Sequence, residues 1–220
     1  GNLALGISSV FIKAFALEEG VNIFEYLSQR KKITLPKPLC NVIGGGKHGG
    51  GAEIQEFLLL PKKEESFKKS IEKIENAYLE IGELLKERDK SFLYSRNLES
   101  AWVTSLDTLQ ILDLLQEVCL RYELTIGMDV AASNFFHTDF YLLKNDKKTP
   151  EELLEFYLDL CKSYDILYIE DPFQEEDFES FSKLTESLKN VLVCGDDLYT
   201  TNPKRLKTGI EKKATNAVLV

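Results

Sequence analysis

The sequence predicts an α/β fold in which parallel strands alternate with helices and curve toward a barrel. First, short apolar segments recur between longer segments of helical periodicity over residues 106–220. Second, these segments are almost continuously apolar, as expected for strands covered on both faces. Third, no strand leads into a G-x-G-x-x-G turn at the start of a helix, the pattern of an open dinucleotide-binding sheet. A barrel is therefore preferred to an open doubly wound sheet.

Two helices are expected first. Residues 3–17 place apolar side chains at helical spacing, and Gly20 follows as a stop signal. A second, short helix is expected at residues 22–27.

The next stretch combines a loop, a strand and a long helix. Prolines punctuate residues 35–38, and a glycine cluster at residues 44–51 predicts a loop, because no regular element tolerates so many glycines. Residues 54–60 form an apolar run that ends at Pro61 and is typical of a strand. Residues 64–90 predict a long helix with one apolar stripe and a solvated face rich in Lys and Glu.

From there helices and strands alternate. Helices are expected at residues 106–122, 150–163, 175–188 and 202–212, and strands at residues 124–130, 166–169, 191–194 and 216–220.

Composition excludes several classes of protein. The formal net charge is −9 over 220 residues, which disfavours a nucleic-acid partner because phosphate binding needs a basic face. No apolar run approaches the ~20 residues that span a bilayer, so neither a membrane anchor nor a signal peptide is expected. The 4 cysteines lie far apart without a C-x-x-C pair, as expected for reduced thiols in a cytoplasmic protein.

Three of the predicted strands end in an acid: Asp129, Glu170 and Asp196. The carboxyl ends of parallel barrel strands open on one face, so these side chains are expected to converge. Converging carboxylates repel one another unless a cation neutralises them, and oxygen-only ligands favour a hard ion such as Mg²⁺. An acid after a strand is, taken singly, more often a cap or turn residue. Three in register favour a metal site, with Asp171 and Asp197 as capping or outer groups.

Five sequence motifs resemble those of enolase, in the same order. GMDVAAS at residues 127–133, IEDPF at 169–173 and GDDLYTTNPKR at 195–205 resemble its three metal-ligand motifs. Upstream, NVIGGGKH at residues 41–48 and IQEF at 54–57 are similar to its histidine loop and its Gln-Glu strand.

The resemblance implies a partial TIM-like (βα) barrel of the enolase type. Residues 1–34 would be the helical lead-in, and residues 35–220 an incomplete barrel domain. The implied reaction is the reversible dehydration of 2-phosphoglycerate to phosphoenolpyruvate, a step of glycolysis and gluconeogenesis. The implied partners are Mg²⁺, a small phosphorylated carboxylate substrate, and further copies of the same chain in a homodimer or larger homo-oligomer.

Site roles follow from the same resemblance. Asp129, Glu170 and Asp196 would bind the first Mg²⁺, and the latter two would also face the substrate. His48 and Gln55 would contact the substrate.

The resemblance implies that two glutamates assist the departure of the hydroxyl group. Glu56 would help to handle the departing hydroxyl, and Glu99 would be the general acid. In the loop RNLESAW at residues 96–102, Leu98 stands where enolases usually have Asp. The apolar neighbours of Glu99 are expected to keep a proton available on its carboxyl.

Two departures leave alternatives open. The histidine loop is one residue shorter than expected, although its glycines suit a mobile lid. The lysine that serves as base in enolases would follow Val220, so residues 1–220 are expected to be part of a longer enolase and inactive alone. The alternatives are a noncatalytic enolase-like scaffold, favoured by Leu98 and the short loop, and another enzyme of the superfamily.

Overall fold

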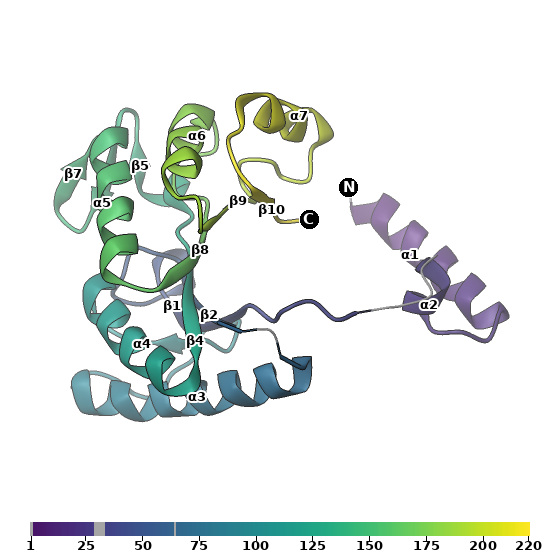
Figure 1. Cartoon of the computed structure of the whole chain (residues 1–220), viewed down its shortest axis with the longest axis horizontal. Coiled ribbons are helices and arrows are strands. Elements are labelled where there is room, and N and C mark those ends of the chain that lie inside the picture. The colour runs from purple at the N-terminus through teal and green to yellow at the C-terminus, as the bar shows by residue number, and fades with distance from the viewer. Residues whose placement is uncertain (1, 29–33, 64) are drawn as a thin grey trace. The chain divides into compact units, whose positions relative to one another are not determined.

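The computed structural model describes residues 2–28, 34–63 and 65–220, and it divides into two compact units, Gly1–Pro36 and Lys37–Val220 (Figure 1). Residues 29–33 of the expected lead-in and residue 64, the expected start of the long helix, lie outside the described residues.

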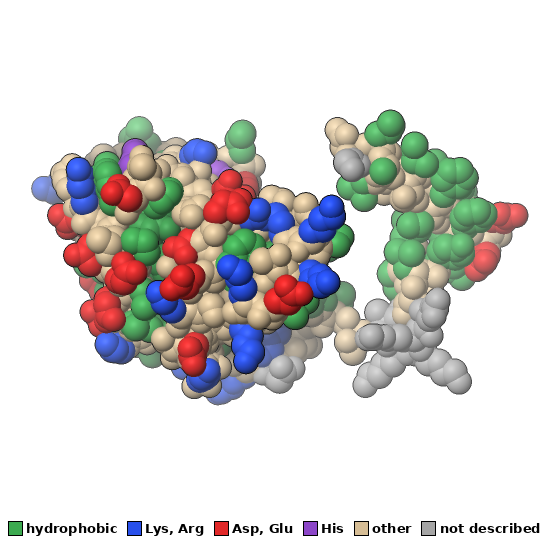
Figure 2. Space-filling view, turned by 90° about the horizontal axis from the view of Figure 1, so that it is seen from above, with side chains coloured by type: hydrophobic (Ala, Val, Ile, Leu, Met, Phe, Trp, Pro, Cys, Tyr) green, Lys and Arg blue, Asp and Glu red, His purple; other side chains and the backbone are tan. Residues whose placement is uncertain are grey.

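The first unit contains helices α1 (Asn2–Glu18) and α2 (Ile23–Leu27), which confirms both predicted helices. Asn22 begins α2 with a capping box, since its backbone N–H donates to Glu25 Oε2 at 2.8 Å. Large hydrophobic side chains are exposed over much of this unit (Figure 2): Leu3, Leu5, Ile7, Val10, Phe11, Phe15, Leu17, Val21, Ile23, Phe24 and Leu27. Among its described helical residues only Ala16 is buried, so the unit has almost no core of its own.

The second unit is built on a 7-stranded sheet with the strand order β10-β9-β8-β4-β2-β1-β3. The strands are β1 (Cys40–Gly44), β2 (Glu56–Pro61), β3 (Trp102–Val103), β4 (Leu124–Asp129), β8 (Ile166–Glu170), β9 (Leu192–Gly195) and β10 (Ala217–Val218). The described strands do not close into a complete barrel, in agreement with the predicted partial one.

Strand directions follow from the connections. β4, β8, β9 and β10 are joined through helices and run parallel, as predicted. β2 is antiparallel to both β1 and β4. It follows β1 through the glycine loop without a crossover helix, and a connection of that kind produces an antiparallel pair.

The helices of this unit lie on the outside of the sheet (Figure 1): α3 (Phe67–Arg88), α4 (Thr108–Tyr122), α5 (Pro150–Ser163), α6 (Phe178–Ser187) and α7 (Pro203–Lys212). Each predicted helix is present, and several begin later than expected because a polar residue caps the first turn. The side chains of Ser66, Asp107 and Asp177 each accept a backbone N–H from the residue three positions on.

A 3-stranded antiparallel sheet was not predicted. It comprises β5 (Phe136–His137), β6 (Phe140–Leu143) and β7 (Asp146–Lys148). Tyr141 anchors it, because its ring is fully buried and its hydroxyl accepts the N–H of Gln174 at 3.0 Å.

The four cysteines are free thiols, as predicted. Within the part of the chain that the structure describes, no helix combines the length and apolar character needed to cross a bilayer.

A buried carboxylate closes the turn between α3 and β3. Asp89 is 5% exposed. It accepts hydrogen bonds from the backbone and hydroxyl of Ser91, the hydroxyl of Thr104, and the backbone and hydroxyl of Ser105, all between 2.6 and 2.9 Å. Burial acts to raise the pKa of Asp89, but these hydrogen bonds outweigh it and hold the pKa well below its usual value.

Asp89→Asn is expected to lower the free energy of unfolding at pH 7 by about 2 kcal/mol. The charge-assisted hydrogen bonds to the carboxylate are lost, and the NH₂ group of the new amide faces backbone and hydroxyl donors that it cannot accept from. Since the folded-state pKa is depressed, the contribution of Asp89 is complete above its unfolded pKa of about 4 and is lost as the pH falls below it. Urea unfolding of wild type and variant should therefore converge toward acid pH. Asp159→Asn, at an exposed residue, is the control and should change stability by less than about 0.5 kcal/mol.

Candidate active site

The amino end of β2 and the carboxyl ends of β4, β8 and β9 open on a cavity of about 440 Å³. Every side chain that the sequence singled out for the site lines it: His48, Gln55, Glu56, Glu99, Asp129, Glu170 and Asp196. Leu39, Asn41, Leu58 and Leu219 complete the lining. Residues far apart in the sequence thus meet at one end of the sheet.

Strand register brings the acids together. Glu56 of β2 lies opposite Asp129 of β4, and Asp129 lies opposite Glu170 of β8. Glu170 in turn lies opposite Cys194 of β9, two residues before Asp196. The acids therefore occupy successive positions along the edge of the sheet.

The two central carboxyls are buried, Asp129 at 8% and Glu170 at 6% exposure. Burial, together with the charges of Glu170 and Glu56, raises the pKa of Asp129 to about 8. Burial, together with the charges of Asp196 and Asp197, also raises the pKa of Glu170. Such a cluster either holds protons or binds a cation, and a divalent cation would neutralise the repulsion that raises these pKa values. The donor set therefore fits a hard metal ion.

Neighbouring side chains orient these carboxylates. Gln55 Nε2 donates to Asp129 Oδ2 at 3.1 Å, and Gln55 Oε1 accepts Asn134 Nδ2 at 3.1 Å. The hydroxyl of Tyr168 donates to Glu170 Oε2 at 2.5 Å. Contacts of this kind fix the direction of a metal ligand and tune its affinity.

Tyr168→Phe is expected to weaken cation binding by about 10-fold, at the low end of the effects seen when a group that orients a ligand is removed. Calorimetric titration of the full-length protein with Mg²⁺ measures this. Tyr164→Phe is the matched control, because its hydroxyl donates to Asp113 on α4 instead. Equal affinities for Tyr168→Phe and wild type would show that the hydroxyl does not orient Glu170.

Asp171 and Asp196 differ in what their carboxylates contact. Oxygens of Asp129, Glu170 and Asp171 all lie within 4.8 Å of one another. Asp171 does not line the cavity, however, and its carboxylate accepts the backbone N–H groups of Asp196, Asp197 and Leu198. Burial raises the pKa of Asp171 to about 7 in spite of these hydrogen bonds. Asp171 therefore holds the turn that presents Asp196 to the cavity.

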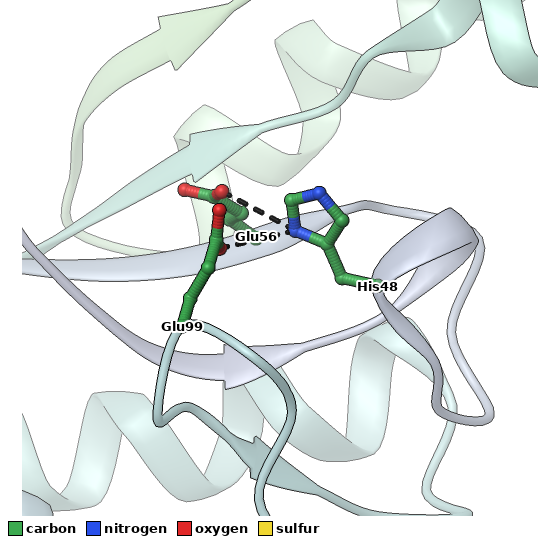
Figure 3. A group of neighbouring side chains, drawn as sticks. All are labelled: His48, Glu56 and Glu99. Atoms are coloured by element: carbon green, nitrogen blue, oxygen red, sulfur yellow. Dashed lines mark ion pairs between the residues drawn. The ribbon is translucent and has the colours of Figure 1, made fainter.

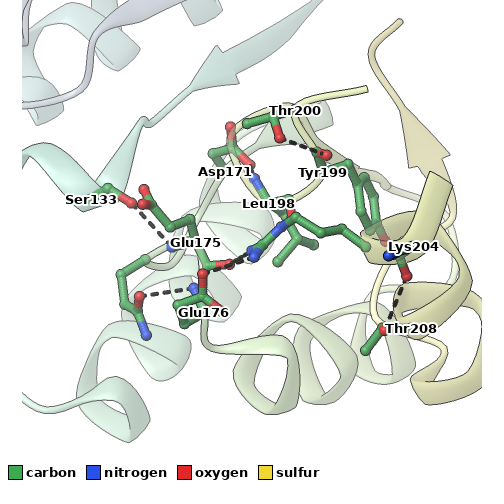
Figure 4. Close-up of polar contacts among 11 residues, drawn as sticks. Ser133, Asp171, Glu175, Glu176, Leu198, Tyr199, Thr200, Lys204 and Thr208 are labelled. Atoms are coloured by element: carbon green, nitrogen blue, oxygen red, sulfur yellow. Dashed lines mark hydrogen bonds and ion pairs between the residues drawn. The ribbon is translucent and has the colours of Figure 1, made fainter. Parts of the chain in front are cut away.

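Arg205 of α7 fastens the same turn from the other side. Its Nε donates to the carbonyl of Leu198 at 2.6 Å, its Nη1 donates to Glu176 Oε1 at 2.8 Å, and its Nη2 donates to the carbonyl of Glu175. Figure 4 shows Glu175 and Glu176 on the loop beside the turn at Leu198. Arg205 thus joins the loops that follow β8 and β9, a role that sequence reasoning missed although it quoted the motif containing this residue.

Beside the strand-end carboxylates, at the same cavity, His48, Glu56 and Glu99 converge (Figure 3). His48 Nδ1 lies 3.4 Å from Glu56 Oε1 and 3.1 Å from Glu99 Oε2. Asn41 Nδ2 donates to Glu99 Oε2 at 2.9 Å, and Asn97 Oδ1 accepts the backbone N–H of Glu99 at 3.0 Å. Sequence reasoning missed both asparagines, because nothing in the chain signals contacts between β1 and a loop this distant.

The expected apolar cover over Glu99 is wrong. Leu98 is fully exposed, Trp102 is buried under other rings, and the side chain of Glu99 is 47% exposed. The desolvated acid is instead Glu56, because burial, a hydrogen bond with Glu99, and the charges of Glu99 and Glu170 raise the pKa of Glu56 to about 8. Burial and these neighbours therefore favour the protonated form of Glu56.

The loop that carries His48 requires glycine at particular positions. Gly49 and Gly50 have φ values of +88° and +142°, and a Cβ at Gly50 would lie 2.5 Å from the carbonyl oxygen of Gly44. Only glycine adopts this path without strain. The loop turns back tightly enough to place His48, on the 3₁₀ turn Gly46–His48, over the cavity.

Fold and site together define an α/β-barrel protein whose strand ends gather carboxylates for cation binding and acid–base chemistry. The family described as "Enolase, C-terminal TIM barrel domain" matches residues 32–220. The chain belongs to the enolase family, a family of lyases, and to the part of it that forms the barrel.

Curated relatives agree. The chain is 38% identical to the enolase of Methanococcoides burtonii, with 100% of this chain and 53% of the relative aligned. It is 37% identical to the enolases of Sulfolobus acidocaldarius and Saccharolobus solfataricus, with 100% of this chain and 54% of each relative aligned. The chain thus spans about half the length of the curated relatives it matches.

Proposed function

We propose that the protein containing this chain catalyses the reversible dehydration of 2-phosphoglycerate to phosphoenolpyruvate, with Mg²⁺ as the cofactor. The observation that carries the proposal is the convergence of two groups in one cavity: the buried carboxylates of Asp129 and Glu170, and beside them the cluster of His48, Glu56 and Glu99. The relatives' printed name, enolase, supports the same reaction.

The carboxylates at the ends of β4, β8 and β9 are assigned to cation binding. Asp129, Glu170 and Asp196 would hold Mg²⁺, since oxygen-only ligands suit a hard ion that keeps positions open for a substrate. When bound, the ion supplies the positive charge that lowers the cost of removing the proton next to the substrate carboxylate. Tyr168 and Gln55 would keep two of the three ligands in place.

The cluster of His48, Glu56 and Glu99 is assigned to the departing hydroxyl. Elimination breaks a C–O bond, and the oxygen leaves as water only if an acid supplies a proton. Glu99 faces the cavity and would deliver that proton, while Glu56 holds a proton at neutral pH and would share it with Glu99. His48 lies against both carboxyls and would orient them.

The proton-abstracting base is assigned elsewhere in the protein. Of the described residues that line the cavity, none is a lysine. The base would therefore come from the part of the enolase length that this chain does not span, and residues 1–220 are expected to show no turnover in isolation.

A second candidate is a noncatalytic scaffold of the same fold. Leu98, a fully exposed apolar side chain beside Glu99, is the observation that favours it, because exposed apolar loop residues suit protein contacts.

The two candidates are separated by assaying the full-length protein with 2-phosphoglycerate, with Mg²⁺ and after its removal by a chelator. We expect phosphoenolpyruvate to form only with Mg²⁺. The Glu99→Gln protein, prepared identically, controls for a contaminating enolase. Failure of the wild-type protein to form phosphoenolpyruvate while it binds Mg²⁺ would reject the proposed reaction in favour of the scaffold.

A further inference from the structure

The turn that carries Glu99 is shaped by the side chain of one residue, Asn97. Leu98 is fully exposed and the side chain of Glu99 is 47% exposed, so packing alone does not hold this segment in place. We propose that Asn97 is a positioning residue, which fixes the backbone of Glu99 and thereby the place of its carboxyl in the cavity. The effect of Asn97 on turnover rests on the proposed function, in which Glu99 delivers the proton.

Asn97 closes the turn with its side-chain oxygen. Asn97 Oδ1 accepts the backbone N–H groups of Glu99 and Ala101, each at 3.0 Å. An atom that meets two N–H donors has to be the oxygen of the amide. The backbone of Asn97 completes the turn, since its N–H donates to the carbonyl of Ala101 at 2.9 Å and its carbonyl accepts the N–H of Ser100 at 3.0 Å. A side chain thus supplies the acceptor that no regular element provides here.

The other half of the Asn97 amide packs without hydrogen bonding. Asn97 Nδ2 is buried and has no hydrogen-bond partner among the described residues. It lies against β1, where a Cβ on Gly44 would come within 2.4 Å of it. The contribution of Asn97 to the turn therefore lies in Oδ1, which an aspartate at the same position would retain.

Both ends of the turn are anchored to the rest of the second unit. The hydroxyl of Tyr78 on α3 donates to the carbonyl of Ser100 at 2.6 Å, and the guanidinium of Arg96 lies 4.4 Å from the centre of the Trp102 ring. Ser100 has a φ of +65°, in the left-handed region that costs conformational energy for a residue other than glycine. Such a conformation persists only where its surroundings enforce it. With both ends held, Asn97 sets the path of the backbone between them.

The position of this backbone decides where the Glu99 carboxyl lies. Glu99 Oε2 accepts Asn41 Nδ2 at 2.9 Å and lies 3.1 Å from His48 Nδ1. Both partners come from the region of β1 and the glycine loop, on the other side of the gap that Glu99 crosses. A misplacement of about 1 Å can cost on the order of 100-fold in rate. A shift of the turn is therefore expected to act on proton delivery without touching the cation ligands.

The kinetic test uses the full-length protein at saturating Mg²⁺. Asn97→Ala is expected to lower kcat at least about 10-fold, while KM and Mg²⁺ affinity stay within about 3-fold of wild type. Asn97→Asp keeps Oδ1 and is expected to restore kcat to within about 3-fold of wild type. Asn190→Ala, at an exposed asparagine in the turn before β9, is the matched control and should keep wild-type kcat.

A double variant separates positioning of Glu99 from a general structural role. If Asn97 acts through the Glu99 carboxyl, Asn97→Ala should lower kcat no further once Glu99→Gln is present. Losses that multiply in the double variant would overturn the positioning role. Wild-type kcat in Asn97→Ala, or a kcat of Asn97→Asp no higher than that of Asn97→Ala, would overturn it as well.

Crystal structures of the same full-length variants judge the position of Glu99 apart from the reaction. In Asn97→Ala we expect the distance between Glu99 Oε2 and Asn41 Nδ2 to exceed about 3.5 Å, and in Asn97→Asp we expect the hydrogen bond to remain. A hydrogen bond that survives in Asn97→Ala would contradict the inference. If the wild type forms no phosphoenolpyruvate, the proposed function fails, whereas a displaced Glu99 in Asn97→Ala would still identify Asn97 as the residue that holds it.

Discussion

Asp196→Asn is expected to lower the Mg²⁺ affinity of the full-length protein by more than about 100-fold, beyond the usual effect of removing a group that only orients a ligand. Asp196 presents its carboxylate to the cavity, and the amide that replaces it carries no charge to offset the cation. Asp171→Asn is expected to lower affinity by only about 10-fold, because Asp171 acts through the turn that carries Asp196. Calorimetric titration with Mg²⁺ measures both.

Asp197→Asn is the control for charge. Asp197 is adjacent in sequence and exposed, and it lies outside the cavity lining, so its replacement should leave the Mg²⁺ affinity within about 3-fold of wild type. A larger loss of Mg²⁺ affinity in Asp171→Asn than in Asp196→Asn would instead assign Asp171 as the third ligand. This is the specific alternative, because an oxygen of Asp171 lies close to those of Asp129 and Glu170.

Glu99→Gln is expected to lower kcat by about 1,000-fold, in the middle of the range for loss of a general acid. A glutamine amide has no proton to give to the departing hydroxyl, yet it retains the shape of the side chain and the contact with Asn41. Mg²⁺ affinity and KM should change little, because Glu99 is not among the proposed cation ligands. Steady-state kinetics at saturating Mg²⁺ provides the measurement.

Glu72→Gln, on the solvated face of α3, serves as the matched substitution and should keep wild-type kcat. If Glu99→Gln retained wild-type kcat while Glu56→Gln lost it, the acid would be Glu56, whose pKa is raised by burial. Loss of Mg²⁺ affinity in Glu99→Gln would contradict the assignment of Glu99 to the departing hydroxyl rather than to the cation.

The regular elements were predictable because periodicity is a local property. Residues 150–163 were predicted as a helix and form one with the same bounds, since Thr149 caps a segment with a clear apolar stripe. The direction of β2 was not predictable, because it depends on how a glycine loop connects two strands in space. The small sheet around Tyr141 was missed because its strands are too short to show periodicity.

The candidate site was predictable where sequence position fixes spatial position. Acids at the ends of neighbouring parallel strands must meet, so Asp129, Glu170 and Asp196 could be named before the structure was seen. The surroundings of Glu99 were mispredicted, because apolar neighbours in sequence do not determine which side chains cover a carboxyl. Burial of that kind depends on tertiary packing, and in the folded protein the more deeply buried carboxyl is that of Glu56.

Asp129, Glu170 and Asp196 are proposed to share one divalent cation. Crystals of the full-length protein soaked in Mn²⁺, an oxygen-preferring stand-in for Mg²⁺, would locate it by anomalous scattering. We expect a single strong peak within about 2.5 Å of an oxygen from each of the three carboxylates. A peak coordinated by Asp171 in place of Asp196, or no peak at these strand ends, would contradict it.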